Sequence, residues 1–159
     1  GHGVTVNGCF VIGLDGHTTD IFDRIVEFVR ESQLYEVQVT ILTPFPGTPL
    51  YDRLREEGRL LYDAWWMDPT YTYNKIPFRP ERLSPEELQA LCIEAREKFY
   101  SVGSILRRFA DPVNRSTGFM ARQFPLINFM MRREVQQRND LPLGDEGWQG
   151  QLRPATASC

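Results

Sequence analysis

Two β-branched runs that flank an amphipathic helix constrain the fold of this chain more than any other feature. The first run, VTVNGCFVIGL, covers residues 4–14, and the second covers residues 37–42. Between them, apolar residues recur every three or four positions over residues 18–32, and Thr18 or Thr19 can cap the start of this helix. A strand, a helix and a strand joined by short links predict a βαβ unit with two parallel strands.

Proline and aromatic residues dominate the segment after the second strand. Three prolines within residues 44–49 cannot continue a sheet. A short helix is expected to begin at Leu50 and to stop at Gly58. Residues 61–83 show no period, and we expect their tryptophans and tyrosines to cover an apolar surface, with stacking on a ligand as the alternative.

The second half of the chain has a helical pattern. Ser84 and the three residues after it, Pro-Glu-Glu, place a hydroxyl at the N-cap and a glutamate at the third helical position. One continuous helix up to Asp111 is predicted from the apolar stripe Leu88, Cys92, Ala95, Phe99, Val102, Leu106 and Phe109. A second helix is expected to start or kink near Pro125. Solvated helix faces are expected for Arg107, Arg108, Arg132, Arg133 and Arg138.

These patterns divide the chain into four segments. Residues 1–60 form the α/β unit, residues 61–83 an irregular linker, and residues 84–138 a helical extension packed on the first segment. Residues 139–159 are rich in Gly, Pro and Gln and are predicted to be a disordered tail.

Charge and cysteine spacing narrow the classes of function. The 18 basic and 21 acidic residues give a net charge of -3, so the chain as a whole has no positive field that attracts nucleic acid. No run approaches the roughly 18 to 20 apolar residues of a membrane span, and we expect a soluble cytoplasmic protein. The spacing of cysteines and histidines predicts no metal site, since these residues are isolated: Cys9, Cys92, Cys159, His2 and His17.

Two turns are candidates for a binding site because both follow a predicted strand. Ligands of parallel α/β proteins bind beyond the carboxyl ends of the strands, and the turn at Gly13 and the segment 43–48 lie at this edge. A plain strand-to-helix turn and a plain chain reversal are the alternatives. Asp15 is a lone carboxylate in the first turn, which is more typical of a turn residue than of a general base.

The order of these landmarks resembles a known family. The segments FVIGLDGHT, ILTPFPGTPLYDRLREEGRLL and FRPERLSPEEL are similar to the C-terminal half of radical S-adenosylmethionine proteins. More narrowly, the chain resembles those members that carry an N-terminal cobalamin-binding domain and a helical C-terminal extension. The run TPFPGTPLY followed by EEGRLL carries most of this resemblance.

The resemblance implies a fold, cofactors and a site. The two strands would be the fifth and sixth of a partial (β/α) barrel, whose carboxyl edge holds a [4Fe-4S] cluster and S-adenosylmethionine. Reductive cleavage of S-adenosylmethionine would yield a radical that abstracts hydrogen from a substrate, in some relatives followed by cobalamin-dependent methyl transfer. Contacts to S-adenosylmethionine fall by this resemblance on Val11, Ile12 and Gly13, with Leu42 and Thr43 nearby.

The sequence also departs from the family pattern. The Cys-x3-Cys-x2-Cys motif that binds the cluster is absent, and His17 stands where many relatives have an acidic residue. Three scattered thiolates cannot converge on one cluster. We therefore expect the chain to be part of a longer enzyme, inactive alone, with the missing N-terminal barrel half as its partner. Two strands with open edges are expected to be poorly soluble or to oligomerise.

Other classes of function stay open from the sequence alone. The chain could be a non-catalytic helical interaction module in which the arginine-bearing helices bind a partner and the βαβ unit serves as scaffold. A more distant alternative is nucleotide binding at the Gly13 turn without redox chemistry. No residue is assigned a catalytic role, and the sequence does not identify a substrate.

Overall fold

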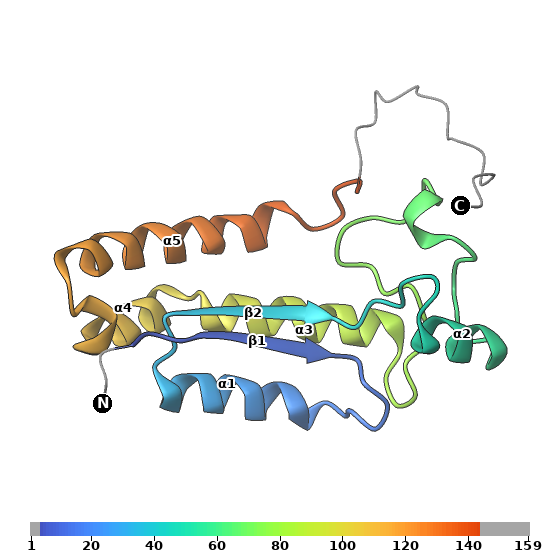
Figure 1. Ribbon diagram of the computed structural model, residues 1–159, viewed down its shortest axis with the longest axis horizontal. Coiled ribbons are helices and arrows are strands. Elements are labelled where there is room, and N and C mark those ends of the chain that lie inside the picture. The colour runs from blue at the N-terminus through green and yellow to red at the C-terminus, as the bar shows by residue number, and fades with distance from the viewer. Residues whose placement is uncertain (1–3, 144–159) are drawn as a thin grey trace, which may run out of the picture.

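The structure, a computed structural model, describes residues 4–143 and has a mixed α/β architecture (Figure 1). The strands β1 (Asn7–Ile12) and β2 (Glu36–Ile41) are parallel and are joined by helix α1 (Asp20–Ser32). Asn7 pairs with Glu36 and Ile12 with Ile41, so the strands are matched along their whole length. The predicted βαβ unit is confirmed.

Four more helices follow the βαβ unit in the described part of the chain. Their bounds are Pro49–Glu56 for α2, Pro85–Phe99 for α3, Val102–Ala110 for α4 and Gly118–Gln137 for α5. Two 3-10 turns, η1 (Trp65–Met67) and η2 (Val113–Arg115), interrupt the connections. Figure 1 shows α3 running behind the two strands, α1 below β1 and α5 above β2, while the side of the sheet toward the viewer carries no helix.

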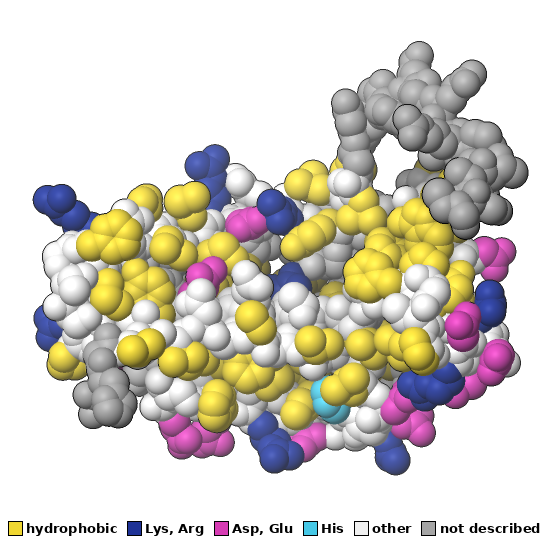
Figure 2. Space-filling model, in the orientation of Figure 1, with side chains coloured by type: hydrophobic (Ala, Val, Ile, Leu, Met, Phe, Trp, Pro, Cys, Tyr) yellow, Lys and Arg dark blue, Asp and Glu magenta, His cyan; other side chains and the backbone are white. Residues whose placement is uncertain are grey.

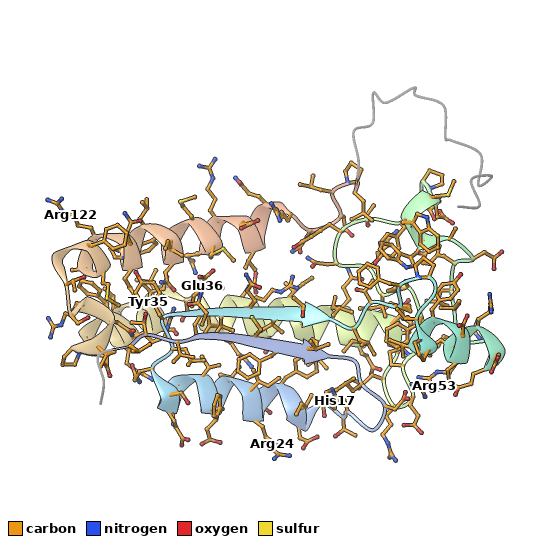
Figure 3. The ribbon with its side chains drawn as sticks, viewed as in Figure 1. His17, Arg24, Tyr35, Glu36, Arg53 and Arg122 are labelled. Atoms are coloured by element: carbon orange, nitrogen blue, oxygen red, sulfur yellow. The ribbon has the colours of Figure 1, made fainter. Side chains whose placement is uncertain are left out.

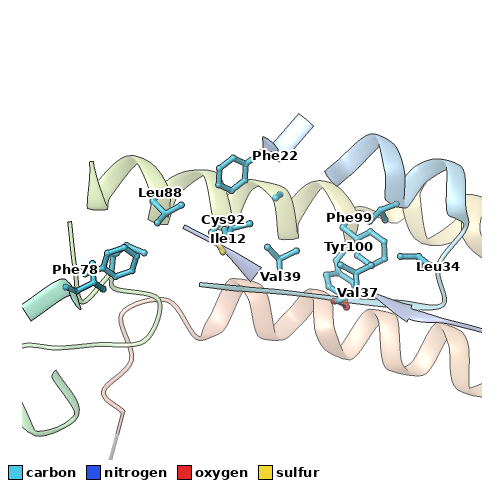
Figure 4. Close-up of a cluster of buried hydrophobic side chains, with 14 residues drawn as sticks. Ile12, Phe22, Leu34, Val37, Val39, Phe78, Leu88, Cys92, Phe99 and Tyr100 are labelled. Atoms are coloured by element: carbon cyan, nitrogen blue, oxygen red, sulfur yellow. Dashed lines mark hydrogen bonds between the residues drawn. The ribbon is translucent and has the colours of Figure 1, made fainter. Parts of the chain in front are cut away.

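The side chains of each strand alternate between the two faces of the sheet. On the face toward α1 and α3, Val37, Val39 and Ile12 are 5% exposed or less. They pack with Leu88 and Cys92 of α3, both fully buried (Figure 4). The apolar core therefore includes residues of both the N-terminal unit and the helical extension, and α3 lies beside α1 as a second helix on the same face.

Local capping explains where several helices begin. The Ser84 hydroxyl accepts a hydrogen bond from the Glu87 backbone N–H, and the Glu87 carboxylate accepts one from Ser84 N–H, which confirms the predicted capping box. The α1 prediction was wrong in one detail, because Thr19 at the N-cap has a helical backbone and makes no side-chain cap bond. The Thr18 hydroxyl instead bonds to the Asp20 side chain.

The helix predicted to run from Ser84 to Asp111 is broken, which corrects the sequence-based expectation. The chain leaves the α3 helix at Tyr100, and the Ser101 hydroxyl caps α4 by accepting from Ser104 N–H. The break rotates the apolar stripe, so that Leu106 is 59% exposed while Ile105 is 1% exposed. In the sequence, the apolar spacing continues from α3 into α4 without interruption, so it does not indicate the break. Ser101, a residue type that favours the N-cap position, does indicate it.

Helix α5 decides between the two alternatives predicted for its start. It begins at Gly118 and contains Pro125 in its interior, so the alternative in which the helix starts near Pro125 is wrong. Of the segment predicted as a disordered tail, Leu141 accepts a hydrogen bond from Tyr73 N–H, and residues 144–159 lie outside the described residues. No helix within residues 4–143 combines the length and apolar character needed to cross a bilayer.

Candidate functional site

The two loops predicted to flank a site lie side by side at the carboxyl edge of the strands. Leu42 N–H donates to the Ile12 carbonyl at 2.8 Å, so the pairing of β1 and β2 extends one residue into the loops. The structure thereby brings together all five residues predicted to contact a cofactor: Val11, Ile12, Gly13, Leu42 and Thr43.

These five residues do not all point the same way. Val11 is 47% exposed on the face without helices, whereas Ile12 is fully buried in the core on the opposite face. Leu42 and Thr43 are half-buried, and the Thr43 hydroxyl donates to the Ile41 carbonyl. The Ile12 carbonyl is paired with Leu42 N–H and its side chain lies in the core, so of these two residues it is Val11 whose side chain can meet a ligand.

Gly13 is required by its backbone geometry and by its neighbours. Its φ of +95° lies in the left-handed region that favours glycine. A Cβ atom at this position would lie 3.0 Å from Leu88 Cδ2 and 3.5 Å from Phe78 Cζ. The residue is therefore needed for the turn itself, whether or not a ligand approaches it.

Asp15 is not an isolated carboxylate. It pairs with the guanidinium groups of Arg53 at 2.5 Å and Arg59 at 2.9 Å, which tie the β1–α1 loop to α2 and to the segment after α2. The hydrogen bonds from Arg53, and then from Arg59, hold the pKa of Asp15 below its usual value. In the same loop, Gly16 N–H donates to a Glu81 carboxylate oxygen at 2.9 Å. The turn is thus anchored. Nothing in the sequence indicated that Arg53 and Arg59 pair with Asp15, because they lie 38 and 44 positions away.

The proline segment after β2 is held as a wall by aromatic residues. Pro44 is buried, and its carbonyl accepts a hydrogen bond from the Trp65 indole at 2.9 Å. Trp65 also lies edge-on to Phe45, with ring centroids 5.9 Å apart, and 5.2 Å from the Tyr71 ring. Burial raises the pKa of Tyr71 to about 12. The aromatic residues pack on one another and on the loop, as predicted for a surface cover.

The face of the sheet without helices is mainly polar. The amide of Asn7 donates to Glu36 at 3.1 Å, and the Thr40 hydroxyl donates to the Phe10 carbonyl at 3.2 Å. Beside the outer edge of β1 runs a shallow groove of about 410 Å³ whose lining includes Val11 and His17. Figure 3 places His17 near the carboxyl end of β1. The groove is mostly apolar and open to solvent.

No group of three or more potential metal ligands occurs within residues 4–143. Cys9 is exposed on the helix-free face, whereas Cys92 is buried between α3 and the sheet, where burial raises the pKa of its thiol. Cys159 lies outside the described residues. Because the two described thiols lie on opposite faces of the sheet, they do not fit the ligand set of an iron–sulfur cluster.

The outer edge of β2 is closed by side chains whose role was not predicted from the sequence. Arg108 is 1% exposed and donates to the carbonyls of Leu34 and Tyr35, both at 3.1 Å. Its guanidinium also bonds to Asn128 Oδ1 at 2.8 Å and lies 3.8 Å from the centroid of the Phe99 ring. The prediction that Arg108 lies on a solvated face was therefore wrong, because the carbonyls of Leu34 and Tyr35, just before β2, and the Asn128 side chain compensate for its burial.

Further along the same edge, two residues of the helical extension continue the closure. The Tyr100 hydroxyl donates to the Val37 carbonyl at 2.7 Å, and the Arg96 guanidinium donates to the Val39 carbonyl at 2.6 and 2.8 Å. Alternate carbonyls of β2 are thus satisfied by side chains where a neighbouring strand would otherwise pair.

Comparisons with known proteins assign this chain to a family. The model of a domain of unknown function, DUF4070, matches residues 48–137, more than half of the chain. The chain is 26% identical over 132 residues to bacteriochlorophyllide d C-12(1)-methyltransferase of Chlorobaculum tepidum, covering 83% of the chain and 26% of that protein. It is 36% identical over 62 residues to hopanoid C-2 methylase of Rhodopseudomonas palustris, covering 39% of the chain and 12% of that protein.

A second Chlorobaculum tepidum protein, bacteriochlorophyllide d C-8(2)-methyltransferase, is 26% identical over 106 residues, which is 67% of the chain and 23% of the relative. The chain spans about a quarter or less of the length of these relatives. No solved structure matches. The chain belongs to the DUF4070 family, and its resemblance to the C-terminal part of a radical S-adenosylmethionine protein of the cobalamin-binding type, with a helical extension, is confirmed.

Proposed function

We propose that this chain forms the closing part of a cytoplasmic radical S-adenosylmethionine methyltransferase and that β1 and β2 are the fifth and sixth strands of its partial (β/α) barrel. The observation that carries the proposal is the contrast between the two edges of the sheet. The β2 edge is closed by Arg96, Tyr100 and Arg108, while β1 pairs with no strand on its other side within residues 4–143.

The arrangement of the helices supports the same proposal. In a (β/α) barrel, helices cover the outside of the strands, and the inward faces line the interior. Here α1 and α3 cover one face of the sheet, and the other face presents Cys9, Val11 and Thr40 to solvent. This second face would line the barrel, with α3 in the place of the helix that follows the sixth strand.

The missing part of the barrel would dock at the open edge of β1. The carbonyls of Val6 and Ile12 face β2, because they accept from Tyr35 N–H and Leu42 N–H. Alternation along the strand turns the backbone groups of Cys9 and Val11 toward the opposite edge, where a fourth strand can pair. The apolar groove along this edge is the place for the side chains of that strand and its helix.

S-adenosylmethionine would bind at the carboxyl edge. Val11 would contribute its side chain and Gly13 its backbone groups, Ile12 would hold the turn from the core, and Leu42 and Thr43 would form the neighbouring surface. The cofactor supplies the deoxyadenosyl radical when it is bound and reductively cleaved. The described thiols do not fit the [4Fe-4S] cluster, so the proposal places the cluster ligands, and the cobalamin site if one exists, elsewhere in the intact enzyme. The names of the relatives favour methyl transfer, and the substrate is unspecified.

Titration calorimetry of the intact enzyme with S-adenosylmethionine tests the site. We expect Val11→Asp to weaken binding at least tenfold, because a carboxylate would enter an apolar contact. Val6→Asp is the matched control, since Val6 is 55% exposed just before the amino end of the same strand, far from the carboxyl edge, and its replacement should leave binding unchanged. Gly13 is unsuitable for this test, because any side chain there strains the turn. Equal affinities for wild type and Val11→Asp would reject the proposed site.

The non-catalytic alternative, a helical interaction module, is favoured by one observation: exposed apolar residues of α5, such as Phe119 and Met130, lie beside the exposed Arg122. This surface lies away from the carboxyl edge, so the two functions are compatible within one protein. Binding of common nucleotides without binding of S-adenosylmethionine would instead support the third candidate, a nucleotide site at the Gly13 turn.

A further inference from the structure

Helix α5 is apolar on two sides. Its inner side includes the fully buried Phe124 and Asn128, which pack against α4 and the start of β2. Its outer side, which we call the α5 outer face, consists of Phe119, Arg122, Leu126, Phe129, Met130 and Arg133. Among these, Phe119 is 73% exposed and Met130 is 62% exposed.

The six residues of the α5 outer face share one side of the helix. At about 100° per residue, they fall within an arc of roughly 100°. Figure 1 shows α5 along the upper margin of the molecule, and in Figure 3 Arg122 points away from the body of the protein. A helix that is apolar on both sides is normally covered on both, and a large exposed apolar patch indicates an interaction surface.

The charge of this region is opposite to that of the whole chain. Residues 102–133 contain six arginines and one acidic residue, Asp111, although the chain has more acidic than basic residues. None of the six residues of the α5 outer face is acidic. Glu134, the one carboxylate of the helix, pairs with Arg138 and lines a cavity toward β2. Figure 2 shows basic side chains projecting from the upper margin with apolar side chains between them.

The neighbouring helix α4 extends the same character. Val102 is 45% exposed and Leu106 is 59% exposed, and Arg107 beside them is also exposed. Helix α1 provides the contrast within the molecule. Phe28 of α1 is 52% exposed, but this helix carries four acidic and two basic residues, as is ordinary for a solvated surface.

We propose that the α5 outer face, together with the exposed side of α4, docks on an anionic lipid surface. Arg122 and Arg133 are eleven residues apart, about 16 Å along the helix, and they bracket Leu126 and Met130. In this arrangement the apolar side chains enter the boundary between headgroups and acyl chains, while the arginine stems follow them and the guanidinium groups meet lipid phosphates.

Two features favour a lipid surface over a protein partner. The face is a convex helix rather than a groove, which suits a flat surface, and its charges are all positive, which suits a surface of uniform negative charge. The proposal adds a location for the protein and does not depend on the proposed enzyme activity. It also differs from a membrane span, because the helix would lie in the plane of the surface.

Vesicle flotation of the full chain tests the docking. We expect binding to vesicles of phosphatidylcholine mixed with phosphatidylglycerol, weak binding to phosphatidylcholine alone, and loss of binding as salt is raised. Replacing two arginines, in the double variant Arg122→Gln and Arg133→Gln, should weaken binding roughly 30-fold. The matched control is Arg24→Gln with Arg30→Gln on α1, which removes the same charge elsewhere and should leave binding unchanged.

A second double variant, Leu126→Gln with Met130→Gln, separates the apolar contribution from the charge and should also weaken binding. Circular dichroism and native-state chromatography verify that each variant is folded. If the Leu126→Gln, Met130→Gln variant does not fold, the Arg122→Gln, Arg133→Gln variant alone decides the test. Absence of vesicle binding by the wild type would overturn the proposal. So would equal binding to neutral and anionic vesicles, equal losses in the α1 control, or a dimer that the apolar pair abolishes while vesicles do not bind.

Discussion

The two outer edges of the small sheet are finished in opposite ways. Along β2, side chains from α3, α4, α5 and the α3–α4 link reach the strand edge, and the carbonyls of Tyr35, Val37 and Val39 all accept hydrogen bonds from them. Along β1, no described strand pairs with the outer edge, and Val11 and Leu14 beside it are 47% and 46% exposed. The sheet can therefore grow in one direction only, which assigns a structural role to the helical extension: it ends the sheet.

The largest expected effect is at the closed edge. Replacing Arg108 with Met removes the donors that serve the Leu34 carbonyl and Asn128 Oδ1, and one of the two that serve the Tyr35 carbonyl, but keeps much of the apolar volume. Burial lowers the pKa of Arg108 to about 10, so the guanidinium is still charged at neutral pH, and its loss also removes a desolvation cost. We expect a net loss of about 3 kcal/mol in the free energy of unfolding, measured by urea denaturation.

Arg107→Met is the control for this variant. Arg107 is the exposed neighbour on the same helix, and its replacement should change the free energy of unfolding by less than about 0.5 kcal/mol. Equal effects of the two variants would mean that the β2 edge is not held by Arg108.

A smaller effect is expected from Tyr100→Phe, which removes one donor from the same edge and leaves the Val37 carbonyl unpaired. We expect a loss of about 1 to 2 kcal/mol. Burial, the largest cause, raises the pKa of Tyr100 from 10 to about 12, so its contribution is complete below pH 10 and is lost between pH 10 and 12. The wild type should lose more stability than Tyr100→Phe over this range, and parallel pH profiles would contradict the assignment. Tyr71, with a similarly raised pKa, should titrate in both proteins.

On the β1 side of the sheet, the loop after the strand is anchored by the pairs of Asp15 with Arg53 and Arg59. Asp15→Asn should loosen this loop modestly. The hydrogen bonds from Arg53 and Arg59 hold the pKa of Asp15 below 3.8, so their contribution is complete above this value and is lost as the pH falls through the lower, folded-state pKa. We expect a loss below about 1 kcal/mol at neutral pH, reduced by salt. Asp52→Asn, which breaks a pair with Arg55 inside α2, is the control, and hydrogen exchange of the Gly16 amide should increase only in Asp15→Asn.

The smallest effect on stability, and the sharpest test of the open edge, is expected from Val11→Lys. A lysine beside an unpaired strand edge opposes pairing with another chain and should leave the free energy of unfolding nearly unchanged, since Val11 is already half exposed. Sedimentation velocity should show less self-association than in the wild type. Thr40→Lys, on the same face but in β2, should not shift the distribution. If the wild-type chain is a monodisperse monomer, the expectation that the open edge of β1 causes self-association is wrong.

Local patterns were sufficient to predict much of the fold. The two strands, the capping box at Ser84 and the stop at Gly58, whose φ is +64°, are set by residues close in sequence. The join between α3 and α4 was missed because the apolar spacing continues through it without a phase change, although Ser101 was available as a cap.

The closure of β2 could not be predicted because it depends on long-range contacts. Arg108 meets carbonyls 73 and 74 positions away, and a sequence pattern cannot distinguish this arginine from its exposed neighbour Arg107. For the candidate site, the strand order placed Val11, Gly13 and Leu42 at one edge, and the resemblance to a family supplied the ligand. The opposite orientations of Val11 and Ile12 follow from strand alternation, but the structure was needed to say which face the helices cover.

Because α3 lines the same core as the two strands, the boundary of the family segment does not coincide with the boundary of the folded unit. The family segment, residues 48–137, includes α3, whereas the strands that α3 protects from water lie before it. If residues 48–137 were moved into another protein, α3 would face strands that its side chains do not fit. A truncation within residues 61–83 would leave the strands without the α3 residues of their core. Chimeras should therefore be joined upstream of β1, so that the strands and their cover travel together.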